Sequence, residues 1–157
     1  MVDDLLDLID ARTEPIGALD RQLLAAARGD PRVKARTQLP GVGILTALMS
    51  TAEVGDITRF PSARTLTAWA GLTPTVRGCD LTVRHGHLCQ QGSAWLRWIL
   101  CEAAQTAQRP PEAADAYQHT ARRRGKKIAT TAVARRLLAR ACHRLREVDA
   151  RRHRQVR

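Results

Sequence analysis

The sequence lacks a long apolar run. No window approaches the roughly eighteen consecutive apolar residues that indicate a membrane-spanning helix. It also lacks the basic and apolar start of a signal peptide, because Asp3, Asp4 and Asp7 lie close to the N-terminus. Its four cysteines include no CxxC pair, which fits reduced thiols better than a disulfide framework. These absences predict a cytoplasmic protein without a membrane partner.

Acidic side chains are scarce outside the first thirty residues. Residues 1–30 contain seven acidic and three basic side chains, and the rest of the chain has a net charge of +15. From Arg122 onward, fourteen Lys and Arg residues stand against Glu147 and Asp149. The sequence has neither a lipidation signal nor a Trp- and Phe-rich apolar face, so this charge favours a nucleic-acid partner over a membrane. A solvated helix face is the alternative.

The chain of 157 residues, 44% of them apolar, is long enough for one domain and an appended helix. Its first segment has a heptad-like stripe, which predicts a coiled-coil helix. Pro15 and Gly17 interrupt the stripe and leave two alternatives, two short helices or one kinked helix. The stripe consists of Leu5, Ile9, Arg12, Ile16, Leu19, Leu23 and Ala26.

The segment LPGVG, residues 39–43, predicts a tight turn between helices. It resembles a helix-hairpin-helix, in which glycines let a phosphate approach the free N–H groups at a helix start. Pro40, Gly41 and Gly43 form the predicted hairpin. An ordinary helix–helix turn is the alternative.

The remaining segments also predict helices, apart from residues 75–91, for which we expect a basic loop or a short hairpin. A short helix passes through Leu66 and Trp69, and Ser93 is the expected N-cap of the next helix. Two more helices follow, one between Pro111 and Gly125 and a long basic one from Lys127. The apolar stripe of the last helix consists of Ile128, Val133, Leu137, Leu138, Ala141 and Leu145. The fold class is therefore mainly α.

Three segments in this order resemble the C-terminal domain of the Piv-type insertion-sequence transposases and DNA invertases. They are LPGVGILTALMSTAEVGDITRFPSARTLTAWAGLTP, QGSAWLRWILCEAAQTA and RRRGKKIATTAVARRLLARACHRL. The resemblance implies residues 1–36 as a coiled-coil remnant, 37–148 as a serine-type transposase domain and 149–157 as a basic tail. It also implies DNA as partner and a guide RNA in the bridge-RNA-guided members. The apolar stripe of the first segment should pack on a helix of the same chain or of another copy, so we expect a homo-oligomer or a partner bound through the coiled coil.

In that family, a serine in the loop after GL-x-P attacks a DNA phosphodiester and forms a covalent intermediate. Counting five residues on from Pro74, with Gly86 and Gly92 in register, places Cys79 at the serine position. A thiolate is a softer nucleophile than an alkoxide, so we expect the loop to have lost cleavage, although nearby cations leave residual attack as an alternative. The candidate DNA-binding residues, beyond the turn, are Arg77, Arg84, His85, His87, Arg97, Arg122, Arg123, Arg124, Lys126, Lys127, Arg135, Arg136 and Arg140.

Other sites are disfavoured. A zinc site from Cys79, His85, His87 and Cys89 lacks the short paired spacing of structural zinc sites. Ser93 is better explained as a helix cap than as a nucleophile. Tyr117, on a predicted helix, is typical of a packed side chain.

The resemblance implies a further RuvC-like DEDD domain that binds divalent metal, and residues 1–157 contain no replacement for it. We therefore expect no metal cofactor in this chain and a truncated, DNA-binding transposase with little autonomous activity. The enzyme-class alternative is a recombinase subunit completed by another polypeptide. The binding-class alternative is a basic helical nucleic-acid-binding protein without recombinase activity.

Overall fold

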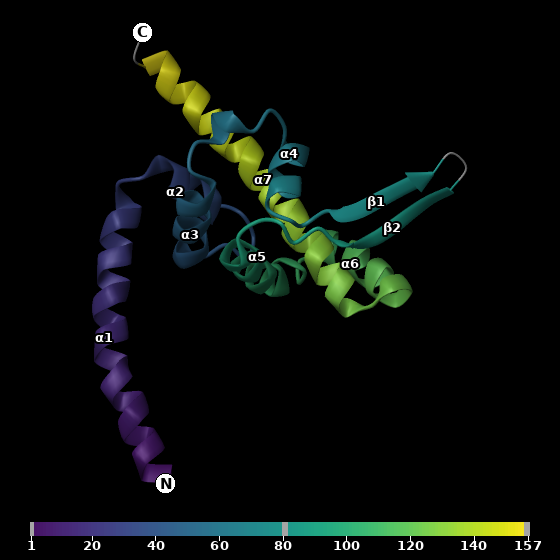
Figure 1. Cartoon of the computed structure of the whole chain (residues 1–157). Helices are drawn as coiled ribbons and strands as arrows, with labels where there is room; N and C mark the ends of the chain where they lie inside the picture. The colour runs from purple at the N-terminus through teal and green to yellow at the C-terminus, as the bar shows by residue number, and fades with distance from the viewer. Residues whose placement is uncertain (1, 80–81, 156–157) are drawn as a thin grey trace.

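A long C-terminal helix, α7 (Lys126–Gln155), is the centre of the fold (Figure 1). The computed structural model describes residues 2–79 and 82–155. Around α7 lie α2 (Pro31–Thr37), α4 (Ala63–Trp69), α5 (Ala94–Ala107) and α6 (Pro111–Arg124), each in contact with it. Helix α3 (Ile44–Val54) packs on α2 and α5, and a 3-10 turn η1 (Ile57–Arg59) leads into α4. The mainly α prediction is confirmed.

The apolar stripe of α7 explains its central place. Leu138 and Leu145 are almost fully buried, with Leu66 of α4 and Leu96 of α5 in the same core cluster. The predicted stripe is confirmed at Val133, Leu137, Leu138, Ala141 and Leu145. It is wrong at Ile128, whose side chain is 51% exposed, because the step of five residues to Val133 places it on another face of the helix.

Polar side chains start three of the helices. Asp30 Oδ1 accepts from the Arg32 N–H at 2.8 Å, and Ser62 Oγ accepts from the Thr65 N–H at 3.1 Å. Ser93 Oγ accepts from the Leu96 N–H at 3.2 Å, which confirms its role as the N-cap of α5. These bonds satisfy N–H groups that have no partner within the helix.

Helix α1 (Val2–Arg28) leaves the body as one helix and passes through Pro15 without a break (Figure 1). Among its described residues only Ala27 is buried. The alternative of two short helices is therefore wrong. Because the helix is solvated around Pro15, water can bond the carbonyl that the proline leaves unpaired. No helix in the described ranges is long and apolar enough to cross a membrane.

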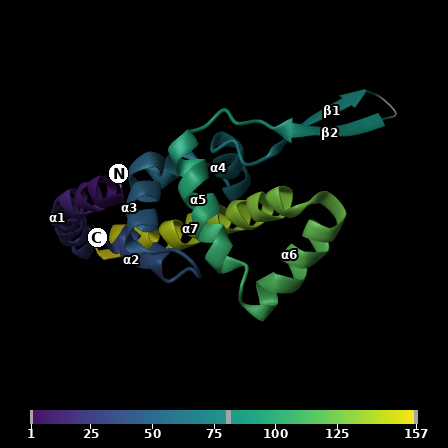
Figure 2. The same ribbon diagram turned by 90° about the horizontal axis from the view of Figure 1, so that it is seen from below.

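The predicted short hairpin is confirmed, with β1 (Pro74–Cys79) antiparallel to β2 (Thr82–Leu88). Figures 1 and 2 show it projecting from the helical body on the side away from α1. Its base is fixed by a close approach at Gly71, which has a φ of +71°. A Cβ there would lie 2.9 Å from the backbone of Gln90. The hairpin therefore leaves the body at one defined place.

Candidate nucleic-acid interface

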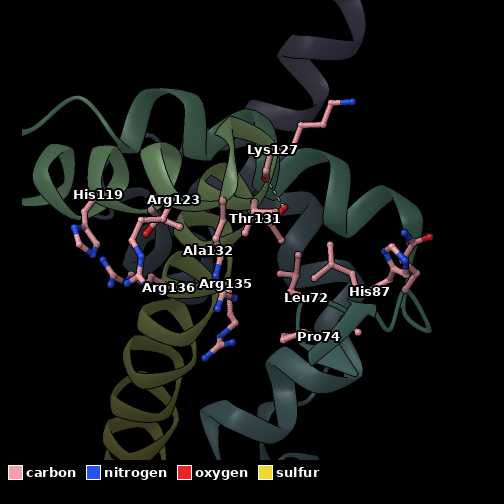
Figure 3. Close-up of a pocket in the computed structure, with 16 residues that line it drawn as sticks. Leu72, Pro74, His87, His119, Arg123, Lys127, Thr131, Ala132, Arg135 and Arg136 are labelled. Carbon is pink, nitrogen blue, oxygen red and sulfur yellow. Dashed lines mark hydrogen bonds between the residues drawn. The ribbon is translucent and has the colours of Figure 1, made fainter. Parts of the chain in front are cut away.

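A cleft of about 710 Å³ lies between the base of the hairpin and helices α6 and α7 (Figure 3). The hairpin and its flanks contribute one wall. The end of α6 and the first three turns of α7 contribute the other. The cleft is lined by Leu72, Pro74, Gly86, His87, Leu88, Gln90, His119, Thr120, Arg123, Arg124, Lys127, Ile128, Thr131, Ala132, Arg135 and Arg136.

The helical wall is basic because of the way α6 ends. Gly125 stops α6 with a φ of +90°, and the chain turns directly into α7. The run of Arg and Lys on both sides of this glycine is thereby split between two helices that contact each other. In Figure 3, Arg123 of α6 and Arg136 of α7 lie close together, with His119 beside them. Two separate helices thus place their cations on one wall.

The charge of this wall is not neutralised within the described part of the chain. Among the residues that the structure describes, the lining includes no Asp or Glu. The ion pairs found among the described residues lie elsewhere, between Arg32 and Asp30 at 2.8 Å and between Arg144 and Glu147 at 3.4 Å. Five Arg and Lys side chains, all exposed, therefore face solvent around one cavity. Uncompensated cations at this density favour a polyanion.

The opposite wall is largely apolar. Leu72 is buried, Pro74 and Leu88 are half-buried, and all three line the cleft. Figure 3 shows Leu72 and Pro74 beside His87, across the cavity from Arg123 and Arg136. Ile128 adds an exposed apolar side chain from α7.

The cleft brings together six of the predicted site residues from three elements. Arg122, Lys126 and Arg140 belong to the same helices and are exposed, but they do not line the cavity. Arg97 does not line it either, because its guanidinium donates to the Gly92 carbonyl and holds the start of α5. The six that line the cleft are His87, Arg123, Arg124, Lys127, Arg135 and Arg136.

The LPGVG turn lies outside the cleft and is packed against α5. Gly41 has a φ of +76°, and a Cβ there would lie 2.4 Å from the Ala103 carbonyl oxygen and 2.8 Å from the Ala107 backbone nitrogen. Gly43 is the N-cap of α3, with no neighbour within 4 Å of a Cβ position. Pro40 is exposed. Gly41 is thus required by packing inside the protein, and the DNA contact predicted for this turn stays a prediction.

The predicted nucleophile, Cys79, lies at the end of β1, where its backbone pairs with Thr82. Arg77 pairs with Arg84, and Val76 pairs with His85. The side chains of Arg77, Cys79, Arg84 and His85 lie outside the described part of the structure. The catalytic prediction at Cys79 therefore stays a prediction. Cys89, Cys101 and Cys142 are free thiols, as expected.

Sequence reasoning missed several lining residues, and one of them had a signal. His119 lies four residues before Arg123 on a predicted helix, so the two share a helix face. Extending the basic face backward by one turn finds His119. Leu72, Pro74 and Gln90 gave no signal, because only the tertiary fold brings them to α7.

Comparison with known proteins gives a family match. The model described as "Transposase IS116/IS110/IS902 family" matches residues 33–118. A "Probable family 20 transposase" of Pseudomonas aeruginosa is 32% identical over 106 residues, covering 68% of this chain and 30% of the relative. The "Insertion element IS110 uncharacterized 43.6 kDa protein" of Streptomyces coelicolor is 31% identical over 126 residues, 80% of this chain and 31% of the relative.

A third relative, the "Transposase for insertion sequence element IS1111A" of Coxiella burnetii, is 34% identical over 93 residues, 59% of this chain and 26% of that protein. The chain thus spans about a third of the length of these curated relatives or less. The family match ends at residue 118, so it includes the hairpin wall of the cleft and stops just before the basic residues of the helical wall.

Proposed function

The chain belongs to the IS116/IS110/IS902 family of transposases, and on this premise we propose that it binds DNA in the transposition of an insertion sequence. The unpaired cations of the cleft are the observation that supports the proposal best. Each Arg or Lys that neutralises a phosphate releases a condensed counterion, so a wall of such side chains attracts the backbone of any sequence. The cleft then contacts the phosphate backbone of the DNA, and other residues select the DNA sequence.

The test is a fluorescence anisotropy titration of the full chain with labelled duplex DNA. The variant Arg123→Gln/Arg135→Gln/Arg136→Gln removes three charges from the cleft. We expect its affinity at low salt to fall roughly tenfold or more, because three phosphate contacts are lost.

A matched control removes three exposed basic residues that lie outside both the cleft and the heptad stripe, as Arg21→Gln/Arg28→Gln/Lys34→Gln. Its net charge changes by the same amount, so it separates a local contact from a general charge effect. Equal losses in the two triple variants would reject the cleft as the binding site.

We further propose that the chain binds DNA without cutting it. Cleavage at Cys79 would form an S–P bond and break a P–O bond, with the displaced oxygen leaving as a hydroxyl. A thiolate is a softer nucleophile than an alkoxide and suits phosphorus poorly.

The claim that the chain does not cut DNA is tested by looking for covalent protein–DNA adducts on denaturing gels with end-labelled DNA. A RuvC-like DEDD domain and any guide RNA are supplied in trans. The parent should form little or no protease-sensitive adduct, Cys79→Ser should raise it, and Cys79→Ala should give none. An adduct that survives Cys79→Ala at the parental level would place the nucleophile elsewhere.

Helix α1 supports a proposal about assembly. Its predicted stripe is exposed, with Leu5, Ile9, Ile16 and Leu19 each more than half accessible. Such a stripe is stabilised by a second helix, and we propose a copy of the same chain. Sedimentation should show a concentration-dependent dimer that Ile9→Glu/Ile16→Glu converts to monomer. A parent that stays monomeric would contradict it.

A further inference from the structure

The cleft has an apolar component that a phosphate backbone does not use. Ile128 lines the cavity with 51% of its surface exposed, although the next residue, Ala129, is buried. Across from the basic wall, Pro74 and Leu88 present further apolar surface. Exposed apolar side chains around a cavity are typical of a binding site for a group that is itself partly apolar.

The size of the cleft restricts this group. A cavity of about 710 Å³ falls within the roughly 300–1,000 Å³ of pockets that hold small-molecule ligands. The bases of a paired duplex are stacked inside the helix, so a duplex can touch only the rim of such a cavity. An unpaired nucleotide has one flat, largely apolar base and one anionic phosphate, which matches one apolar and one basic wall.

The backbone at the rim adds a separate observation. Gln90 has a φ of +53°, and it is the non-glycine residue with a positive φ in residues 2–79 and 82–155. Its N–H donates to the Gly71 carbonyl at 3.3 Å, which holds this conformation. Residues held in this region of φ and ψ cluster at binding sites. The Gln90 side chain lines the cleft with an amide that can donate to and accept from a base edge.

From these features we infer that the cleft takes an unpaired nucleotide of the bound nucleic acid. Its base lies against Pro74, Leu88 and Ile128. Its phosphate lies against Arg123, Arg135 and Arg136. The inference rests on the proposed DNA binding and adds a preference for nucleic acid with an extruded or unpaired base.

The experiment compares three labelled duplexes of the same sequence: fully paired, with one unpaired adenine, and with an abasic residue in place of that adenine. We expect the full chain to bind the unpaired adenine roughly tenfold more tightly than the paired duplex, because an unstacked base gains contact with the protein. The abasic duplex should lose most of that gain.

Two variants localise the preference. Ile128→Asn replaces an exposed apolar side chain in the cleft, so it should reduce the ratio of the two affinities without unfolding the protein. Leu8→Asn is the matched control, because Leu8 is 54% exposed on α1, outside both the cleft and the heptad stripe, and the ratio should stay unchanged. Thermal melts by circular dichroism check that both variants are folded.

The outcomes separate this inference from the proposed function. If no duplex binds, both are overturned. If all three duplexes bind equally and binding depends on the cleft arginines, the proposed function stands and the unpaired-nucleotide inference is wrong. An abasic duplex that binds as tightly as the adenine duplex would also overturn it, since backbone flexibility would then explain the gain.

Discussion

The LPGVG turn and six of the residues that line the cleft were predicted to contact DNA, and the structure places the two sets in different environments. At the turn, Gly41 is packed so closely on α5 that a Cβ would lie 2.4 Å from the Ala103 carbonyl oxygen. At the cleft, five cations are exposed and have no ion-pair partner among the described residues. A glycine motif can therefore reflect internal packing, whereas unpaired charges need a partner from outside.

The largest change in the free energy of unfolding is expected at the LPGVG turn. Gly41→Val forces a branched side chain into a positive φ and against the backbone of α5, so it should lower the free energy of unfolding by about 3 kcal/mol or more. Gly43→Ser is the control, because its site is open and serine is a good N-cap, and stability should stay within about 0.5 kcal/mol. Urea denaturation measures both. A stable Gly41→Val protein with weakened DNA binding would restore the turn as a DNA contact.

A smaller change in the free energy of unfolding, of opposite sign, is expected at Arg36. This cation is buried, whereas the cations of the cleft are exposed. Arg36 is 1% exposed, and its three guanidinium nitrogens have no hydrogen-bond partner in the described structure. Burial lowers the pKa of Arg36 to about 10, with the charge of Arg32 adding to the effect. Arg36→Met should therefore raise the free energy of unfolding by about 2 kcal/mol at pH 7.

The pH dependence follows from the direction of that shift. The pKa of Arg36 is lower in the folded state, so the unfolded state binds the proton more tightly. The cost of burying the charged guanidinium is therefore fully present below about pH 10. It is relieved only as the pH rises above about 10, towards the ordinary pKa of an arginine side chain. The increase in the free energy of unfolding from Arg36→Met should thus be equal at pH 6 and pH 9. Arg32→Met, which removes a paired cation 2.8 Å from Asp30, should destabilise instead. A destabilised Arg36→Met protein would contradict the account.

The smallest effect on stability is expected at the start of α7. Lys127 is in the first turn of the helix, which contains no acidic residue, and a cation there opposes the helix dipole. Lys127→Glu should raise the free energy of unfolding by about 0.5 kcal/mol and weaken DNA binding, whereas Lys127→Gln should change both less. Stability and affinity that fall together would show that Lys127 acts on the fold and not on the ligand.

The sequence predicts the elements better than the site. Periodicity and caps indicate α4 to α7, since the stripe of Leu137, Leu138 and Leu145 and the cap at Ser93 are local features. The basic wall is also visible in the sequence, because its cations are neighbours around Gly125. The apolar wall is not, because Leu72 and Pro74 reach α7 only through the packing of the hairpin base. Ile128 was misassigned because its step of five residues to Val133 does not keep it on the buried face of α7.

The most direct test of the cleft as a phosphate-binding surface is the salt dependence of DNA affinity. Each phosphate contact contributes about 0.9 to the slope of log K against log salt concentration on duplex DNA. The slope for Arg123→Gln/Arg135→Gln/Arg136→Gln should be shallower than that of the parent by about 0.9 per lost contact, with the control variant Arg21→Gln/Arg28→Gln/Lys34→Gln matching the parent. An unchanged slope in the cleft variant would contradict the claim that these arginines bind the phosphate backbone.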